Sequence, residues 1–349
     1  MLRFLLFFLL QAFLCFCALN VSAQKTRIPF PASVGADSVH LSSPCGTDVL
    51  LAGQRQNPAF KAAEEKMNRA ILNYRLADAD IVTLPVVFHI IDDNPSFFSD
   101  AQVQNAINDL NDAFSKSGAY AGSTGVDTKI RFCLARQAPD GGITTGITRT
   151  TSFFARDLNP LIEDARLKNL VQWDPSRYIN IWYIRSMHWE IMAKFQCGTW
   201  LRMYAGGYAT LPPGGGPTDG IVVTGLGTML AHEMGHYLGL YHTFEGLNCQ
   251  NGDCKTDGDR VCDTPPDASV GNAPACNLPD NSCSTDTLSG FTVDVPDDIA
   301  NFMDYGNESC HTKACTRLSN DPCQWCGTAT WQRCRRKSNR LPGTARSAW

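Results

Sequence analysis

After its first 23 residues the sequence lacks any hydrophobic run long enough to cross a membrane. It also lacks an excess of basic residues, since 30 Lys and Arg face 34 Asp and Glu; this balance argues against a nucleic-acid partner. The glycine-rich stretch 212–216 lacks the spacing of a phosphate-binding loop, so we interpret it as an ordinary loop. No signal for an oligomeric state is present.

The first 23 residues form one apolar segment. Arg3 precedes a run of Leu, Phe, Ala and Cys, and the segment ends with the small-x-small sequence Val21-Ser22-Ala23. This arrangement is typical of a secretory signal peptide. We therefore expect a secreted, extracellular protein with no membrane attachment after signal removal; an uncleaved anchor is the alternative.

Cysteine is abundant, with 15 residues in the chain. Two of them, Cys15 and Cys17, lie in the expected signal peptide, which leaves an odd number in the exported chain. Secretion exposes these cysteines to an oxidising compartment, where disulfides form. Because the number is odd, we expect one thiol to be left over.

Three of the 7 histidines fall in the run 232–242, which reads His-Glu-x-x-His-x-x-Gly-x-x-His. On a helix, residues four apart share a face, so His232 and His236 point the same way. Gly239 can leave the helix at positive φ, which lets the chain double back and present His242. Three imidazoles with an open fourth position are typical of a catalytic zinc site; a core helix with satisfied histidines is the alternative.

Two segments supply the other parts of a peptide-hydrolysing site. Glu233, beside the first histidine, is placed to act as general base on a zinc-bound water. In the run 301–305, Met303 would sit in a tight turn and form a hydrophobic floor beneath the metal. Tyr305, two residues on, could donate its hydroxyl to the oxyanion of a tetrahedral intermediate. These residues predict zinc-dependent hydrolysis of peptide bonds in protein or peptide substrates.

Cys45 is the cysteine of greatest interest upstream of this site. It precedes Gly46 in an otherwise polar stretch. A thiolate here could fill the open fourth position on the zinc and keep the enzyme latent. The alternative is that Cys45 pairs in a disulfide.

The loop that follows the zinc motif, residues 249–266, is rich in cysteine, glycine and aspartate. Clustered carboxylates can supply the oxygen ligands that calcium requires, although the spacing is not that of an EF-hand. A solvated acidic loop is the alternative. The candidate calcium ligands are Asp253, Asp259, Asp263 and Thr264, with Glu245 and Asp257 as further candidates.

Alternating apolar patterns predict an α+β fold with a mixed twisted sheet above a cleft. One apolar strand contains His89, which we interpret as a core histidine rather than a ligand. An extended substrate would add to an edge strand of the cleft, for which 220–224 is the candidate. Expected strands span 84–91, 129–134, 178–184, 207–211 and 220–224, and expected helices span 58–74, 100–114 and 160–171.

These patterns divide the chain into four parts: a signal peptide (1–23), a pro-segment (24–78), a catalytic domain (79–310) and a tail (311–349). The tail holds eight Lys or Arg and Asp321 as its single acidic residue, without helical or strand periodicity. We expect it to be poorly ordered. A basic tail that binds acidic surfaces is the alternative.

The runs 230–245, 258–265 and 301–305 together resemble the pappalysin family of metzincin metalloendopeptidases, in particular its small cytophagalysin- or ulilysin-like members. The resemblance implies a metzincin-type zincin domain with an active-site helix and a Met-turn. It implies zinc ligation by the three histidines, catalysis by Glu233 and Tyr305, a Met-turn at Met303, a latent-state Cys-Gly segment and a nearby calcium. Two disulfides implied by the resemblance would be Cys249–Cys276 and Cys283–Cys310. We expect Cys254–Cys262 as a local extra pair and Cys133–Cys197 as a remaining pair.

The sequence departs from this family after Cys310, where a Phe-Thr-x-Gly-Gln helix would follow but His311 leads into the basic tail instead. A second departure is a shortened segment at 224–229. The first departure motivates an alternative function, a catalytically impaired secreted binding protein whose Met-turn is unsupported. A disulfide-stapled scaffold without metal is a further alternative.

Overall fold

In this computed structural model, the described part of the chain is built around a mixed sheet of eight strands. The structure describes residues 41–72, 81–192, 200–254, 256–270, 276, 280–284, 291, 293–306 and 308–313. All of them belong to one unit, Pro31–Trp349. The expected signal peptide and the tail beyond Lys313 lie outside the described residues. No described helix is long and apolar enough to cross a membrane.

The strand order is β1-β7-β8-β5-β2-β3, with β4 beside β2 and β6 beside β7. β7 runs antiparallel to β6 and β8, and the other pairings are parallel. The strands are β1 (Leu41–Cys45), β2 (Val82–Asp92), β3 (Ile130–Leu134), β4 (Ile147–Thr151), β5 (Ile179–Tyr183), β6 (Met187–Met192), β7 (Trp200–Ala209) and β8 (Ile221–Val223). This mixed sheet confirms the predicted α+β class.

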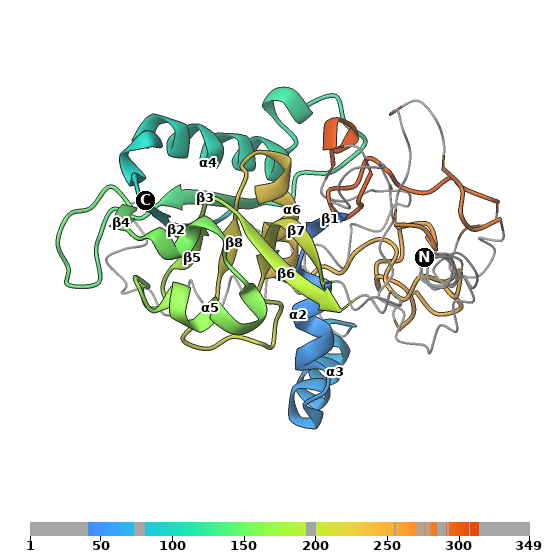
Figure 1. Cartoon of the computed structure of the whole chain (residues 1–349). Helices are drawn as coiled ribbons and strands as arrows, with labels where there is room; N and C mark the ends of the chain where they lie inside the picture. The colour runs from blue at the N-terminus through green and yellow to red at the C-terminus, as the bar shows by residue number, and fades with distance from the viewer. Residues whose placement is uncertain are drawn as a thin grey trace, which may run out of the picture. The chain divides into compact units, whose positions relative to one another are not determined.

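Helices cover both faces of the sheet (Figure 1). Helices α4 and α6 pack on one face and α5 on the other, while α2 and α3 follow β1. The helices are α2 (Thr47–Gln54), α3 (Pro58–Leu72), α4 (Asp100–Ser115), α5 (Pro160–Lys168) and α6 (Thr228–Leu238). Short 3-10 turns are η1 (Pro95–Phe97), η2 (Gly118–Tyr120), η3 (Phe153–Arg156) and η4 (Glu308–Cys310).

The main core lies between the sheet and helices α4 and α6. On α4 the apolar stripe faces this core, and Ser99 and Gln102 form a capping box at the helix start. The capping box fixes the residue at which the helix begins, and from this start the stripe faces the sheet. The buried stripe consists of Val103, Ile107, Leu110 and Phe114.

Two strand predictions were wrong. The segment 220–224 is not an edge strand, because β8 pairs with β7 on one side and β5 on the other. The strand expected at 207–211 is the end of the longer β7, and β6 was not expected at all. Gly206 and Gly207 interrupt the apolar pattern of β7, which hid the earlier part of the strand.

The disulfide pairing differs from the one that the resemblance implied. The bridges are Cys249–Cys283 and Cys276–Cys310, and the local pair Cys254–Cys262 forms as expected. The reason is the fold of the loop: Ser282 N–H donates to Asp297 and the Ser282 hydroxyl to Asp267. These bonds hold the neighbouring Cys283 next to Cys249, which leaves Cys276 to meet Cys310.

The expected Cys133–Cys197 bridge is also wrong. Cys133 carries a free thiol on β3, where it contacts the carbonyl oxygen of Leu84. Cys197 lies outside the described residues. It comes three residues before Trp200, which begins β7, and strands β8, β5 and β2 separate β7 from β3.

Candidate metal centre and active site

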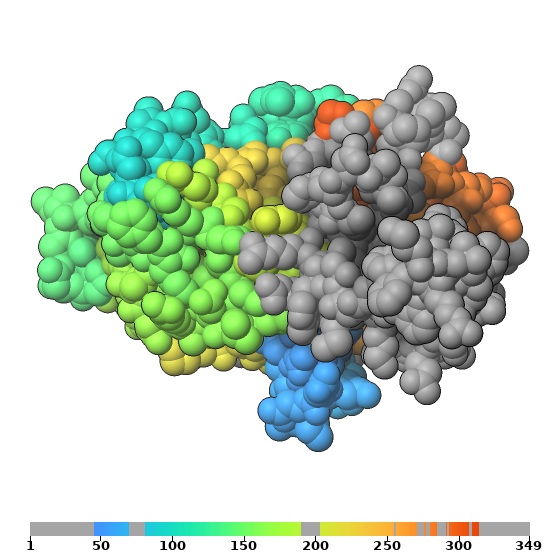
Figure 2. All heavy atoms as spheres, viewed as in Figure 1, coloured from blue at the N-terminus to red at the C-terminus, as the bar shows by residue number. Residues whose placement is uncertain are grey.

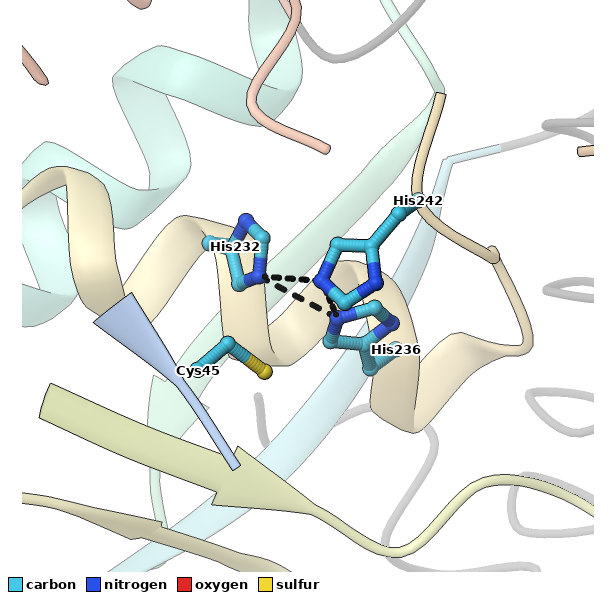
Figure 3. Close-up of side chains that lie close together, drawn as sticks. All are labelled: Cys45, His232, His236 and His242. Atoms are coloured by element: carbon cyan, nitrogen blue, oxygen red, sulfur yellow. Dashed lines mark hydrogen bonds between the residues drawn. The ribbon is translucent and has the colours of Figure 1, made fainter. Parts of the chain in front are cut away.

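Helix α6 and the loop after it bring the three histidines together. Their Nε2 atoms lie 3.1 Å apart between His232 and His236, 3.0 Å between His236 and His242, and 3.3 Å between His232 and His242. Figure 3 shows the three imidazoles turned toward one point. Four-residue spacing on the helix accounts for the first pair.

Gly239 explains how the third histidine reaches the site. It ends α6 with φ of 109°, a conformation that a residue with a Cβ rarely adopts. Its amide donates to the carbonyl of His236, and the amide of Leu240 donates to that of Gly235. This helix end reverses the chain and places His242 opposite the helical pair, as the sequence predicted.

Each imidazole is oriented through its other nitrogen. Nδ1 of His232 lies 2.5 Å from the carbonyl oxygen of Phe302, and Nδ1 of His236 lies 2.8 Å from that of Leu240. Nδ1 of His242 lies 2.9 Å from a carboxylate oxygen of Asp48. Because all three partners accept, each Nδ1 carries the proton and each Nε2 keeps a lone pair for a metal.

The chemistry of this donor set fits zinc. Burial and the neighbouring imidazoles hold the pKa values of His232 and His236 well below the ordinary value, so both rings stay neutral. Nitrogens bound about 2.0–2.1 Å from a tetrahedral zinc are about 3.3 Å apart, close to the separations seen here. Among the described residues, these histidines and Cys45 form the one group of His, Cys, Asp or Glu that could hold a metal.

Cys45 completes this group from the end of β1. Its Sγ and the three histidine nitrogens all lie within 4.8 Å of one another, and Figure 3 shows the sulfur pointing toward the imidazoles. Cys45 is fully buried, and burial raises the pKa of its thiol well above the ordinary value. A bound cation would act in the opposite direction, since a coordinating thiol is deprotonated.

Gly46 explains how Cys45 is placed so deeply. The Gly46 amide donates to the carbonyl of Gly207 at 2.8 Å. A Cβ on Gly46 would lie 2.8 Å from Trp189 Cζ3, so only glycine allows this approach to the sheet. Cys45 therefore depends on a glycine at the next position to reach this place.

Glu233 is fully buried beside the histidines. Its Oε2 accepts a hydrogen bond of 3.2 Å from the Thr47 hydroxyl. Burial raises its pKa to about 8, while hydrogen bonds from Cys45 and Thr47 act in the opposite direction. The carboxylate lies against Gly207 of β7, where an added Cβ would be 2.7 Å from Glu233 Cγ. The Glu233 side chain thus packs directly against the backbone of β7.

Met303 packs against helix α6. A Cβ on Gly235 would overlap its Sδ, so the thioether packs directly against the helix backbone between His232 and His236. The Met303 amide donates to Asn301 Oδ1, and its carbonyl accepts from the amide of Thr243, next to His242. The turn therefore contacts both segments that carry histidines.

Tyr305 lies on the other side of the histidines. Its ring centroid is 4.6 Å from that of His242 and 5.9 Å from that of His232. Its hydroxyl donates to the backbone oxygen of Cys45 at 3.3 Å, so it already binds a carbonyl at this centre. A substrate carbonyl is chemically the same kind of acceptor.

The segment 45–72 adds contacts that sequence reasoning missed. Thr47 accepts from the Ala209 amide of β7 at 3.0 Å while it donates to Glu233. Asp48 is the partner of His242. Figure 2 shows the blue atoms of this segment against the green and yellow atoms of the following chain. The sequence did contain a signal for these contacts: Thr47 and Asp48 are polar residues close to the candidate ligand Cys45, so they can reach the same centre.

Further along this segment, Arg55 joins it to the loop after the histidines. Its guanidinium binds Glu64 in a two-bond contact of 2.8 and 3.1 Å, and it donates to Glu245 at 2.9 Å. Glu64 also accepts from the Tyr241 hydroxyl at 2.8 Å. Glu245 is thus engaged by an arginine.

The candidate calcium ligands only partly converge. Asp259 is buried, accepts from the Val261 amide at 2.9 Å and is hydrogen-bonded by Thr264. Burial raises its pKa, and nearby Asp263 acts in the same direction. Asp253 donates its amide to Asp257 at 3.0 Å instead. Calcium binding by this loop stays a prediction.

His89 is a core histidine. Its Nε2 lies 2.9 Å from Asn180 Oδ1, which also accepts from the Trp173 amide and is therefore an acceptor. Its Nδ1 lies 2.7 Å from the Thr148 hydroxyl. Both nitrogens are satisfied, so the ring is not available to a metal.

Comparisons with known proteins agree with this geometry. The peptidase family M43, described as pregnancy-associated plasma protein-A, matches residues 163–317, which include the histidine motif and the Met303 turn. Residues 163–317 thus match the pappalysin family. Relatives among curated proteins are extracellular metalloproteases of Colletotrichum graminicola and Sordaria macrospora. They are 27% identical over 262 residues (72% of this chain, 78% of the relative) and 28% identical over 292 residues (80% and 87%).

Solved structures extend the comparison to the fold of this chain. A promirolysin mutant of Tannerella forsythia covers 86% of this chain and 99% of its own length, with a TM-score of 0.61 and 22% identity. Mirolysin in complex with an added compound covers 74% and 91%, with a TM-score of 0.50 and 25% identity. The fold is thus the metzincin fold that the sequence predicted, and the chain is a zinc metalloendopeptidase.

Proposed function

We propose that this chain is a secreted zinc metalloendopeptidase made in a latent form, with Glu233 as general base. The observation that carries the proposal is the convergence of His232, His236 and His242 with Cys45 next to the Glu233 carboxylate. The extracellular relatives and the apolar first 23 residues support secretion. Protein or peptide chains are the substrates.

The three histidines would hold zinc through Nε2. When bound, zinc lowers the pKa of a coordinated water to about 7 and polarises the scissile carbonyl. Glu233 takes a proton from the attacking water through its carboxylate and passes it to the leaving amine. The Tyr305 hydroxyl donates to the developing oxyanion, as it now donates to the Cys45 carbonyl. Met303 supports the histidine helix from below.

The substrate would bind along β7. In the structure β1 occupies this edge, pairing with β7 from Met203 to Gly207. Removal of residues 41–45 would expose the β7 edge for an extended substrate to add as a strand. Because Gly207 touches Glu233, a peptide bond paired there would lie beside the general base.

Latency would follow from Cys45. Its sulfur lies where the fourth zinc ligand belongs, and Thr47 hydrogen-bonds the Glu233 carboxylate. Both contacts end when residues 24–78 are removed. Calcium at Asp253, Asp259, Asp263 and Thr264 is a further part of the proposal, supported by the Asp259–Thr264 contact. Titration calorimetry would test it, because binding at millimolar calcium is expected.

The alternative of an impaired binding protein depended on an unsupported Met-turn. The carbonyl of Lys313 accepts from the amide of Phe302, next to Met303, and Lys313 forms a bridge with Asn301, so the turn is supported from residue 313. This contact favours the peptidase over the binding protein.

The test is Glu233→Gln. This nearly isosteric change removes the base and keeps the histidines, so zinc content should stay at one per chain while cleavage of a fluorogenic peptide falls at least about 1,000-fold. Wild-type cleavage that stops with a chelator and returns with zinc is the control. Full activity of the variant would end the assignment of Glu233.

A further inference from the structure

The first three residues of the expected tail are ordered and pack against the turn that carries Met303. The amides of Thr312 and Lys313 donate to the carbonyl of Ala300 at 2.9 and 3.1 Å, and the Phe302 amide donates to the Lys313 carbonyl at 2.9 Å. Lys313 and Asn301 form a parallel bridge. Residues 311–313 therefore make defined backbone contacts with the turn, and residues 314–349 lie outside the described part.

Lys313 is anchored by charge as well as by backbone pairing. Its ammonium forms an ion pair with Asp298, and both side chains are more than nine-tenths buried. Asp298 also accepts from the Asn301 amide side chain at 3.3 Å, and the Asn301 backbone amide donates to the Asp298 carbonyl. A buried pair of this kind is strongly destabilised when one partner is removed, because the other charge remains buried.

A single residue, Phe302, connects this anchor to the metal centre. The N–H of Phe302 donates to the Lys313 carbonyl. The preceding residue, Asn301, is hydrogen-bonded to Asp298. The C=O of Phe302 accepts from His232 Nδ1 at 2.5 Å. A shift of the turn away from Lys313 would therefore move the acceptor that fixes the orientation and tautomer of His232.

We propose that Lys313 is a positioning residue of the zinc centre: its buried ion pair with Asp298 holds the backbone of Phe302, and thereby His232, in the metal-binding geometry. The inference rests on the proposed role of His232 as a zinc ligand. It makes 311–313 part of the active-site support, although these residues belong to the segment that departs from the family.

The test compares Lys313→Met with Lys313→Arg in the full chain. Zinc affinity is measured by competition with a chromophoric chelator, and the visible spectrum of the cobalt-substituted protein reports the ligand geometry. Lys313→Met should weaken zinc binding about 10-fold, the lower range for loss of a partner that orients a ligand, and change the cobalt spectrum. Lys313→Arg keeps the charge and should restore both readouts.

The matched control is Arg185→Met, which removes the partner of another buried carboxylate, Asp92, bound at 2.7 and 3.0 Å. It should lower thermal stability while zinc affinity and the cobalt spectrum stay unchanged. If Lys313→Met does not fold, the isosteric Asp298→Asn removes the same ion pair and is measured in its place. Unchanged zinc affinity and spectrum in a folded variant that lacks the ion pair would overturn the inference. A wild-type chain that binds no zinc would instead overturn the proposed function.

Discussion

Individual glycines determine how closely the parts of the site approach one another. Gly207 lets β7 touch the Glu233 carboxylate, and Gly235 lets the Met303 sulfur touch the helix backbone. Both positions are filled by the smallest residue because the neighbouring side chain occupies the volume of a Cβ. The close packing around Glu233 excludes water, and this burial is the main cause of its raised pKa.

His89 should make the free energy of unfolding depend on pH. Burial lowers its pKa to about 4, against about 6.5 in an unfolded chain. Between these values the unfolded state binds more protons, so the free energy of unfolding should fall as pH drops from about 6.5 to about 4, by at most about 3 kcal/mol. Denaturant unfolding at pH 7, 5.5 and 4.5 measures this slope. The slope is proportional to the number of protons that the chain takes up on unfolding, and in His89→Gln this number should be smaller by about one. An unchanged slope would contradict the assignment of His89 as a buried, neutral histidine.

Among the elements, β1 and α2 bring the most groups to the site. From this short stretch Cys45 reaches the histidines, Thr47 reaches Glu233 and Asp48 reaches His242. Arg55 then binds Glu245 on the loop beyond the histidines. The stretch therefore contacts a candidate metal ligand, the candidate base and the loop that carries the third histidine.

Substitutions in this stretch test its role in latency. Cys45→Ala should shorten the lag before the secreted precursor becomes active, at least several-fold, because the fourth position opens. Thr47→Val should give a smaller change in the same direction, since it releases the Glu233 carboxylate but leaves Cys45 beside the histidines. Progress curves with a fluorogenic peptide measure both. Thr128→Val, which removes a hydroxyl bonded to Phe114 O, is the control with an unchanged lag; a wild-type lag in Cys45→Ala would refute the latch.

How much could be predicted from sequence depended on the range of the interaction. The α6 helix, its end at Gly239 and the α4 capping box were correct because they follow from spacings of a few residues. The partner of Cys283 was wrong because sequence alone does not determine disulfide connectivity. The roles of Asp48 and Lys313 were missed because each depends on a contact with residues far away in the chain.

Over the whole molecule, the site is assembled from segments that the chain brings together across its length. Residues 45–48, the α6 helix with His242, and the turn at Met303 come from three separate regions. Among the described residues, three disulfides between residues 249 and 310 hold the loops that separate the last two of these regions. The centre should therefore be lost as a unit when either its metal or its supporting loops are removed.

We expect one zinc to be held by His232, His236, His242 and Cys45 in the secreted precursor. X-ray absorption at the zinc edge tests it most directly on the purified full chain. We expect one zinc per chain, with three nitrogen ligands at about 2.0–2.1 Å and one sulfur at about 2.3 Å, and loss of the sulfur signal in Cys45→Ala. A precursor without zinc, or with a sulfur signal that persists in Cys45→Ala, would contradict the claim.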